Sequence, residues 1–374
     1  MAGIYVHIPF CKQACNYCNF HFSTSLQLKN DLVVALLKEI ELTSPYEKSE
    51  STDTIYFGGG TPSLLGHVEL SSILNAIFKK FKVVPGAEIT LEANPDDINP
   101  EVLKFWKDEG INRLSIGIQS FYNRDLRWMN RAHNSEQGIR SMEQSLKAGF
   151  DNFSIDLIYG IPGLMDEEWV KNIEKVTAFN VPHISCYALT VEPKTALKKL
   201  IETKKVPDVD AEQQSRQFLL LMEKLEAEGY DHYEISNFAV PGKRSRHNSS
   251  YWMGKPYYGF GPAAHSYDGI NTRSWNIANN ALYIKSISAG QIPFEKEELN
   301  DSQKLNEYIM TSLRTMEGMS LLKITDEYGE DAAEKVLKTL KKFEDKIYRA
   351  GDNIILTKTG KLYADGIASE LFVV

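Results

Sequence analysis

Three cysteines stand within eight residues near the start of the chain, and their spacing is the first sign of chemistry. Cys11, Cys15 and Cys18 form a C-x3-C-x2-C loop directly after a run rich in β-branched and aromatic residues. Three thiolates on one short loop can bind three irons of a [4Fe-4S] cluster and leave the fourth iron without a protein ligand. A structural zinc ion completed by His21 is the alternative. The cluster is favoured, because zinc loops seldom close a strand.

An iron without a protein ligand is open to a small chelating molecule. The amine and carboxylate of S-adenosylmethionine form such a chelate, and one electron passed to its sulfonium would release a 5′-deoxyadenosyl radical. The fourth cysteine, Cys186, is remote in sequence and is expected to be a small buried apolar residue.

The elements that position this loop alternate along the chain. Short β-rich runs and helical patterns follow one another up to residue 190, which predicts an α/β fold with parallel strands, here a partial (β/α)6 barrel. We expect this domain to span 1–275, with 230–275 as loop and short strand because prolines interrupt it. A small helical, winged-helix-like domain is expected over 276–374. The expected strands are 4–8, 54–57, 88–92, 113–118, 153–159 and 184–189.

Barrels of this kind carry their functional groups on the loops that follow the strands. The second expected strand ends in Gly59, Gly60 and Thr61, where a backbone without side chains can approach a ligand. Carboxylates at the ends of later strands can accept hydrogen bonds from ribose hydroxyls, and an arginine can bind a carboxylate. The residues expected in these roles are Glu92, Gln119, Arg131 and Asp156.

Charge and hydropathy exclude several classes of function. The formal net charge is −8, which argues against a nucleic-acid surface. No apolar run approaches the ~20 residues of a spanning helix, and the first residues do not resemble an export signal. We therefore expect a cytoplasmic protein without a transmembrane segment.

The amino-acid sequences of these loops resemble those of the radical S-adenosylmethionine superfamily. The runs Tyr5 to Cys11, Phe57 to Ser63, Glu92 to Pro95, Gly117 to Phe121 and Ile155 to Gly163 are similar to the oxygen-independent coproporphyrinogen III dehydrogenase group within it. The resemblance implies a [4Fe-4S] cluster on Cys11, Cys15 and Cys18. It also implies contacts to S-adenosylmethionine from Tyr5, Gly59, Gly60, Thr61, Glu92, Gln119, Arg131 and Asp156.

Three features depart from the decarboxylating dehydrogenase. Phe20 stands where that enzyme has a further cysteine, few residues precede Ile4, and a His247-Asn-Ser-Ser-Tyr-Trp252 segment is present. Together they resemble a haem chaperone branch of the group, which binds haem as cargo and passes it to acceptor proteins. His247 is then the expected haem contact, with His265 as a further candidate, and no catalytic residue is assigned.

The resemblance leaves several alternatives open. A porphyrin-metabolism enzyme of the dehydrogenase type and a radical enzyme that modifies haem remain beside the favoured chaperone. An electron donor is expected as a partner, and the chain is expected to be a monomer or a dimer.

Overall fold

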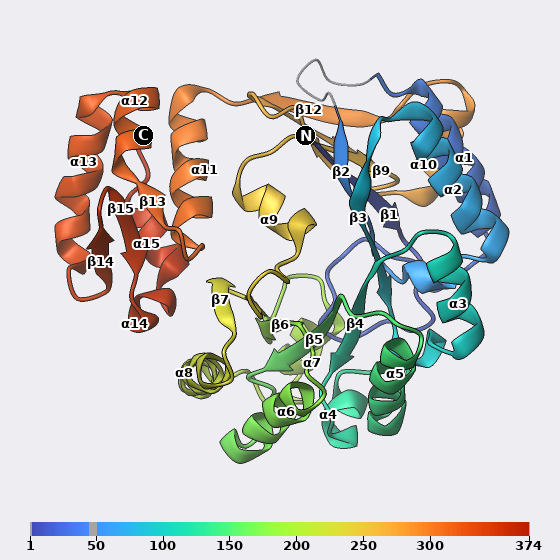
Figure 1. Cartoon of the computed structure of the whole chain (residues 1–374), viewed down its shortest axis with the longest axis horizontal. Coiled ribbons are helices and arrows are strands. Elements are labelled where there is room, and N and C mark those ends of the chain that lie inside the picture. Colours follow the sequence, from blue (N-terminus) through green and yellow to red (C-terminus); the bar gives the residue numbers. More distant parts are fainter. Residues whose placement is uncertain (1, 45–50, 374) are drawn as a thin grey trace.

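The computed structural model describes residues 2–44 and 51–373 and is built around one curved sheet (Figure 1). Twelve strands within these residues join in the order β12-β11-β10-β9-β1-β2-β3-β4-β5-β6-β8-β7. The central six strands are parallel, and their helices cover the outside of the curve. The predicted α/β class and partial barrel are confirmed. These six are β1 (Ala2–Ile8), β2 (Thr52–Gly59), β3 (Val83–Ala93), β4 (Arg113–Gln119), β5 (Phe153–Tyr159) and β6 (His183–Ala188).

Two of the crossover helices, α3 (Pro100–Asp108) and α5 (Ser135–Lys147), begin at asparagine caps. The Asn99 side chain accepts hydrogen bonds from the backbone N–H groups of Glu101 and Val102. The Asn134 side chain accepts one from the backbone N–H of Gln137. These caps satisfy donors that have no partner inside the helix. The helices are α1 (Lys29–Leu42), α2 (His67–Lys80), α3 (Pro100–Asp108), α4 (Asn123–Trp128), α5 (Ser135–Lys147), α6 (Asp166–Ala178), α7 (Ala196–Glu202) and α8 (Ala211–Ala227).

Strand β1 shows how the sequence separates the two faces of the sheet. Ile4, Val6 and Ile8 are fully buried in the main apolar cluster. Tyr5 and His7 point to the opposite face, because successive side chains of a strand alternate, and the Tyr5 hydroxyl lies 3.0 Å from His7 Nδ1. Polar side chains are thereby placed inside the barrel, where a ligand site can form.

Further strands extend the sheet at both edges. β9 pairs in parallel with β1, and β10, β11 and β12 continue antiparallel from it, while β8 and β7 follow β6. The predicted boundary after residue 275 falls inside β11, so the pairing of β11 with β12 keeps residues beyond it in the large sheet. The strands are β7 (Asp231–Glu234), β8 (Asn237–Ala239), β9 (Tyr257–Phe260), β10 (His265–Tyr267), β11 (Thr272–Asn276) and β12 (Phe294–Glu298).

The expectation of only loop and short strand over 230–275 is wrong, because this segment contains helix α9 (Arg246–Trp252). The Ser245 side chain caps the helix by accepting the backbone N–H of Asn248. Pro241 and Pro256 lie outside the helix on either side. Proline therefore bounds this helix rather than breaking it.

The C-terminal part forms its own packing unit, beyond helix α10 (Asn280–Ser288), which lies against α1. A second buried apolar cluster runs from Leu305 to Leu371. Helices surround a three-stranded antiparallel sheet, as predicted for a helical, winged-helix-like domain. The elements are α11 (Asp301–Leu313), β13 (Met319–Ser320), α12 (Leu321–Tyr328), α13 (Glu330–Leu340), β14 (Ile347–Ala350), β15 (Asn353–Leu356), α14 (Lys358–Lys361) and α15 (Ala364–Glu370).

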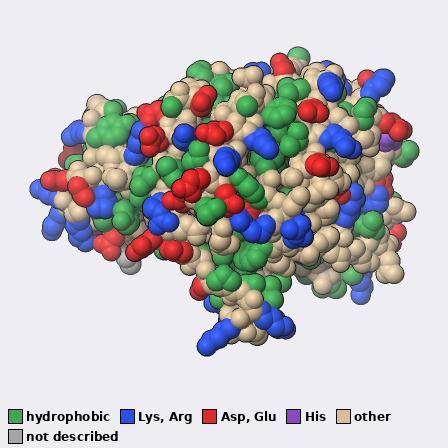
Figure 2. Space-filling view, turned by 90° about the horizontal axis from the view of Figure 1, so that it is seen from below, with side chains coloured by type: hydrophobic (Ala, Val, Ile, Leu, Met, Phe, Trp, Pro, Cys, Tyr) green, Lys and Arg blue, Asp and Glu red, His purple; other side chains and the backbone are tan. Residues whose placement is uncertain are grey.

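The surface carries both signs of charge. Acidic and basic side chains are interspersed over the face shown in Figure 2. The acidic residues therefore do not form a single negatively charged patch on that face. Among the described residues, no helix combines the length and apolar character needed to cross a membrane.

Glu39 of α1 ties the extended sheet edge to the barrel. Its carboxylate is 2% exposed and accepts three hydrogen bonds, from the Tyr283 hydroxyl at 2.5 Å, the Gly261 backbone N–H at 2.8 Å and Asn276 Nδ2 at 2.5 Å. Burial raises the pKa of Glu39 to about 7. One buried side chain thus joins α1 to α10, to β11 and to the turn after β9.

We predict that Glu39→Gln removes a pH dependence from the stability. The unfolded carboxyl titrates at about 4.3, so between that pH and about 7 the folded state binds more protons than the unfolded state. The wild type therefore loses stability as the pH rises through this interval, by about 4 kcal/mol in total. Urea unfolding below about pH 5 and above about pH 8 measures this as a changing difference between wild type and variant. A difference that stays constant with pH would contradict the role of Glu39.

Candidate cluster and cofactor pocket

The cysteine loop leaves β1 and is closed at its base by backbone hydrogen bonds. The Cys11 N–H donates to Ser23 O at 3.0 Å, and the Ser23 N–H donates to Pro9 O at 2.9 Å. Farther along, Asn16 donates its backbone N–H to Met129 O. Hydrogen bonds therefore join the two ends of the loop to each other, and one further bond joins the loop to the segment after α4.

The three cysteines and most of the predicted ligand residues line one pocket of about 420 Å³. Because parallel strands end at the same edge, side chains far apart in sequence meet there. The predicted residues in its wall are Cys11, Cys15, Cys18, Gly59, Gly60, Thr61, Glu92, Gln119, Arg131 and Asp156. Tyr5 is absent from this wall, since it lies deeper on β1 with its hydroxyl against His7.

Arg131 connects the cysteine loop to the strand ends. Its Nη1 donates to Cys15 Sγ at 3.3 Å, and its Nη2 donates to Asn94 Oδ1 at 2.7 Å and to Gly117 O at 2.8 Å. The Nε atom is buried without a partner among the described residues. A guanidinium charge is thereby held beside the sulfur of Cys15.

The glycine turn after β2 brings backbone directly against this loop. Gly60 donates its N–H to Ile8 O at 3.0 Å, and Thr61 donates to Phe10 O at 2.7 Å. A Cβ on Gly59, whose φ is +102°, would lie 2.3 Å from His7 Nδ1. Only glycine fits at position 59. Because it has no side chain, the turn can lie against His7 without filling the pocket.

Two half-buried carboxyl groups face the pocket from β3 and β5, on either side of β4. Glu92 Oε1 accepts a hydrogen bond from the Tyr56 hydroxyl at 2.8 Å, and Asp156 Oδ1 accepts one from Ser115 at 3.3 Å. Burial raises the pKa of Glu92 to about 7 and that of Asp156 to about 6. Gln119 lies at a register shift between β4 and β5, and its φ is +68°. Such an irregularity changes the direction of the side chain at the end of the strand.

The donor arrangement fits a cluster better than a single zinc ion. No three His, Cys, Asp or Glu side chains within the described ranges lie close enough to share one ion, whereas a cluster spreads its thiolates over separate irons. His21 Nε2 is instead 2.7 Å from Asn280 Oδ1. Cys186 is buried in β6, as predicted for a small apolar residue.

The pocket also contains residues that the sequence analysis did not assign. Asn94 bridges Arg131 and Thr61, accepting from the first and donating to the second at 3.2 Å. It follows Glu92 by two positions, and that alternation is the signal that identifies it. Ser115, Tyr187 and Thr190 also line the pocket. Their positions in or just after a strand did not distinguish them from structural residues.

His247 lies outside this pocket, in α9, and is 1% exposed. Its Nδ1 is 2.8 Å from Thr54 Oγ1, its Nε2 is 2.8 Å from the Tyr251 hydroxyl, and its ring stacks on Tyr56 at 4.9 Å. Burial lowers the pKa of His247 to about 3, so the ring is neutral. Both nitrogens are occupied in this conformation, while His265 of β10 is exposed. Haem contact by either residue stays a prediction.

Comparisons with known proteins agree with this geometry. The family model described as Radical SAM superfamily matches residues 5–176. "Heme chaperone HemW" of Mycobacterium tuberculosis is 32% identical over 374 residues, covering 99% of this chain and 94% of the relative. HemW of Bacillus subtilis is 33% identical over 372 residues and covers 98% of both chains. The solved structure of coproporphyrinogen III oxidase (HemN) from Escherichia coli has a TM-score of 0.86 at 23% identity, covering 100% of this chain and 90% of its own, and shows the shared fold.

The barrel and its three-thiol loop are those of the radical SAM superfamily. Within that superfamily, the near full-length likeness shows that the chain belongs to the HemW family.

We predict that Gly60→Ala destabilises the chain by roughly 1–3 kcal/mol, because its Cβ would lie 2.7 Å from Ile8 O and from Phe10 N and O. Gly366→Ala in α15 is the matched control, since a Cβ at that position would have no neighbour within 4 Å, and removing a helical glycine stabilises by about 0.5–1 kcal/mol. Urea unfolding of both variants compares the two effects. Equal behaviour would contradict the close approach of the turn to the cysteine loop.

Proposed function

We propose that Cys11, Cys15 and Cys18 hold a [4Fe-4S] cluster and that S-adenosylmethionine binds beside it. The convergence of the three thiols with Arg131 and the glycine turn in one pocket supports this proposal. When bound, the pair supplies a one-electron cleavage of the sulfonium.

The chain's own groups would bind and orient the cofactor. The backbone from Gly59 to Thr61 would hold its methionine end, and the Arg131 guanidinium would offer charge-assisted hydrogen bonds to a carboxylate. Glu92 and Asp156 accept hydrogen bonds from hydroxyl groups, as acidic residues do in nucleotide sites. Tyr5 supports this wall from below through His7.

We predict that only three cysteines are needed for the cluster. Iron and sulfide bound after anaerobic reconstitution should be lost in Cys11→Ala, Cys15→Ala and Cys18→Ala, because each removes a ligand that no other described thiol can replace. Cys186→Ala is the control and should retain the wild-type content, since its thiol is buried in β6. An equal loss in Cys186→Ala would refute the three-ligand assignment.

We further propose that the chain binds haem and transfers it to acceptor proteins. The observation that carries this proposal is the near full-length similarity to relatives named haem chaperones. Local features agree, because Phe20, at 67% exposure beside the cysteine loop, replaces the additional cysteine of the dehydrogenase. The fold shared with HemN keeps porphyrinogen decarboxylation as the second candidate.

His247 is proposed as part of the haem site. In the described conformation it could bind iron only after one ring nitrogen gives up its partner, Thr54 at Nδ1 or Tyr251 at Nε2. Its alternative contribution is to hold Tyr251 in place, since a hydrogen-bonded imidazole fixes the phenol ring. Either contribution makes haem affinity depend on this side chain.

We predict a one-to-one complex with ferric haem, transfer of that haem to an apo-haem protein, and no conversion of coproporphyrinogen III under anaerobic, reducing conditions. His247→Ala should weaken haem binding, measured by titration in the visible spectrum. His67→Ala, at an exposed position on α2, is the matched control and should leave binding unchanged. Formation of a decarboxylated porphyrin would reject the chaperone proposal in favour of the enzyme.

A further inference from the structure

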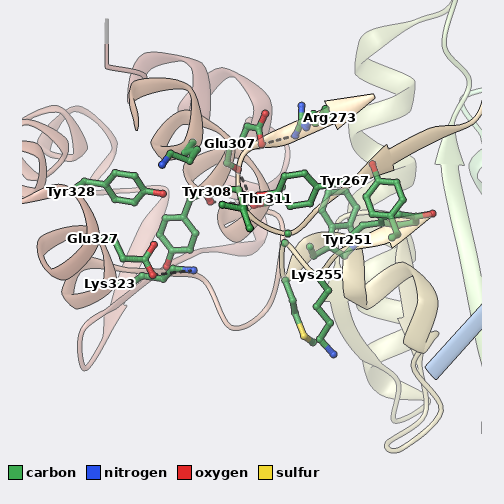
Figure 3. A pocket seen from close by; sticks show the side chains of 17 residues that line it. Tyr251, Lys255, Tyr267, Arg273, Glu307, Tyr308, Thr311, Lys323, Glu327 and Tyr328 are labelled. Carbon is green, nitrogen blue, oxygen red and sulfur yellow. Dashed lines mark hydrogen bonds and ion pairs between the residues drawn. The ribbon is translucent and has the colours of Figure 1, made fainter. Parts of the chain in front are cut away.

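A second cavity, of about 760 Å³, lies between the extended sheet edge and the C-terminal domain (Figure 3). Helix α9 and strands β10 and β11 supply one wall, and α11 and α12 supply the other. It shares no lining residue with the cysteine pocket. We name it the tyrosine cleft after the tyrosines that line it, which are Tyr251, Tyr257, Tyr267, Tyr308 and Tyr328.

The walls of the tyrosine cleft present flat aromatic rings. On the sheet side, the rings of Tyr251 and Tyr257 meet edge to face with centroids 4.7 Å apart, and Tyr267 follows at 6.4 Å from Tyr257. On the opposite side, Tyr308 carries the Lys323 ammonium 4.4 Å above its ring. Aromatic side chains facing one another across a cavity of this size suit a flat, largely apolar ligand.

Positive charge is concentrated at the same place, although the chain as a whole is acidic. Four cations line the cleft against two carboxylates, Glu307 and Glu327. Arg273 pairs with Glu307 across the cleft at 2.5 Å, Lys304 pairs with Asp301 and Lys323 pairs with Glu327. Lys255 has no ion pair among the described residues and is the cation left for a ligand. The cleft therefore favours a ligand that carries carboxylates. The four cations are Lys255, Arg273, Lys304 and Lys323.

Two hydroxyls in the cleft, those of Tyr257 and Tyr328, are left for a ligand. Three of its tyrosines use their oxygens within the protein, through contacts with His247, Ile270 and Ser320. The Tyr328 hydroxyl makes no hydrogen bond within the described residues and points into the cleft in Figure 3. Tyrosine oxygen is an established type of haem iron ligand.

We infer that the tyrosine cleft is the haem site of this chain, an inference that rests on the proposed haem-binding function. The macrocycle lies between the two tyrosine walls, its carboxylates reach Lys255 and the neighbouring cations, and the Tyr328 oxygen binds the iron. The phenol proton passes to solvent as the iron–oxygen bond forms. His247 acts from behind as a positioning residue, because its Nε2 contacts the Tyr251 hydroxyl.

The test uses two single variants and their matched controls, titrated with ferric haem and with iron-free protoporphyrin IX. Lys255→Glu should weaken both ligands by about tenfold or more, because it replaces a charge-assisted contact by repulsion. Tyr328→Phe should weaken haem and shift its visible spectrum but leave iron-free protoporphyrin unaffected. Lys285→Glu on α10 and Tyr348→Phe on β14 lie outside the cleft and should match the wild type.

The outcomes separate this inference from the proposed function. If the wild type binds haem but Lys255→Glu and Tyr328→Phe behave like their controls, the cleft is overturned and the haem-binding function stands. Loss of haem in Asp156→Asn, with both cleft variants intact, would move haem into the cysteine pocket and also overturn the cleft. No haem binding by the wild type would reject both proposals. Equal thermal unfolding of variants and controls establishes that the differences do not come from misfolding.

Discussion

The parallel register of the six central strands is the constraint on which the cysteine pocket depends. Ile8 stands opposite Gly59, so the glycine turn lies directly against the base of the cysteine loop. Asp156 stands opposite Gly117 on one side and Ser185 on the other, which places its carboxyl beside the polar groups of β4 and β6. A slip by one residue would turn each of these side chains to the other face of the sheet. The backbone pairing therefore decides which side chains meet in the pocket.

Periodicity and strand-end position predicted the parts of the site that local sequence encodes. The six strands, the crossover helices and the convergence of Cys11, Glu92 and Asp156 follow from alternation and from the geometry of parallel sheets. Tyr5 could not be placed by the same reasoning, since whether an inward side chain lines a cavity or supports one depends on how neighbouring rings fill the barrel. The Glu39 contacts with Asn276 and Tyr283 join positions more than 200 residues apart, and no local pattern records them.

Helix α9 links the two cavities through its buried histidine, His247. Tyr56 donates to Glu92 in the cysteine pocket and stacks on His247, and His247 in turn contacts Tyr251 in the wall of the tyrosine cleft. A polar group at such depth requires hydrogen-bond partners, and both ring nitrogens have them. The sequence predicted a haem contact in the segment from His247 to Trp252. The cleft that this segment helps to form also needs Tyr308 and Tyr328 from the C-terminal domain. That cavity arises only when distant parts of the chain pack together.

We propose that a three-thiol cluster with one open iron shares its pocket with the groups that bind S-adenosylmethionine. Mössbauer spectroscopy of protein reconstituted with enriched iron tests it most directly, because the method distinguishes individual iron sites. One iron of the [4Fe-4S] cluster should change its signal when S-adenosylmethionine is added, while the three thiolate-bound irons keep theirs. In Asp156→Asn the same change should require more S-adenosylmethionine. Four irons that do not respond to S-adenosylmethionine would contradict the claim.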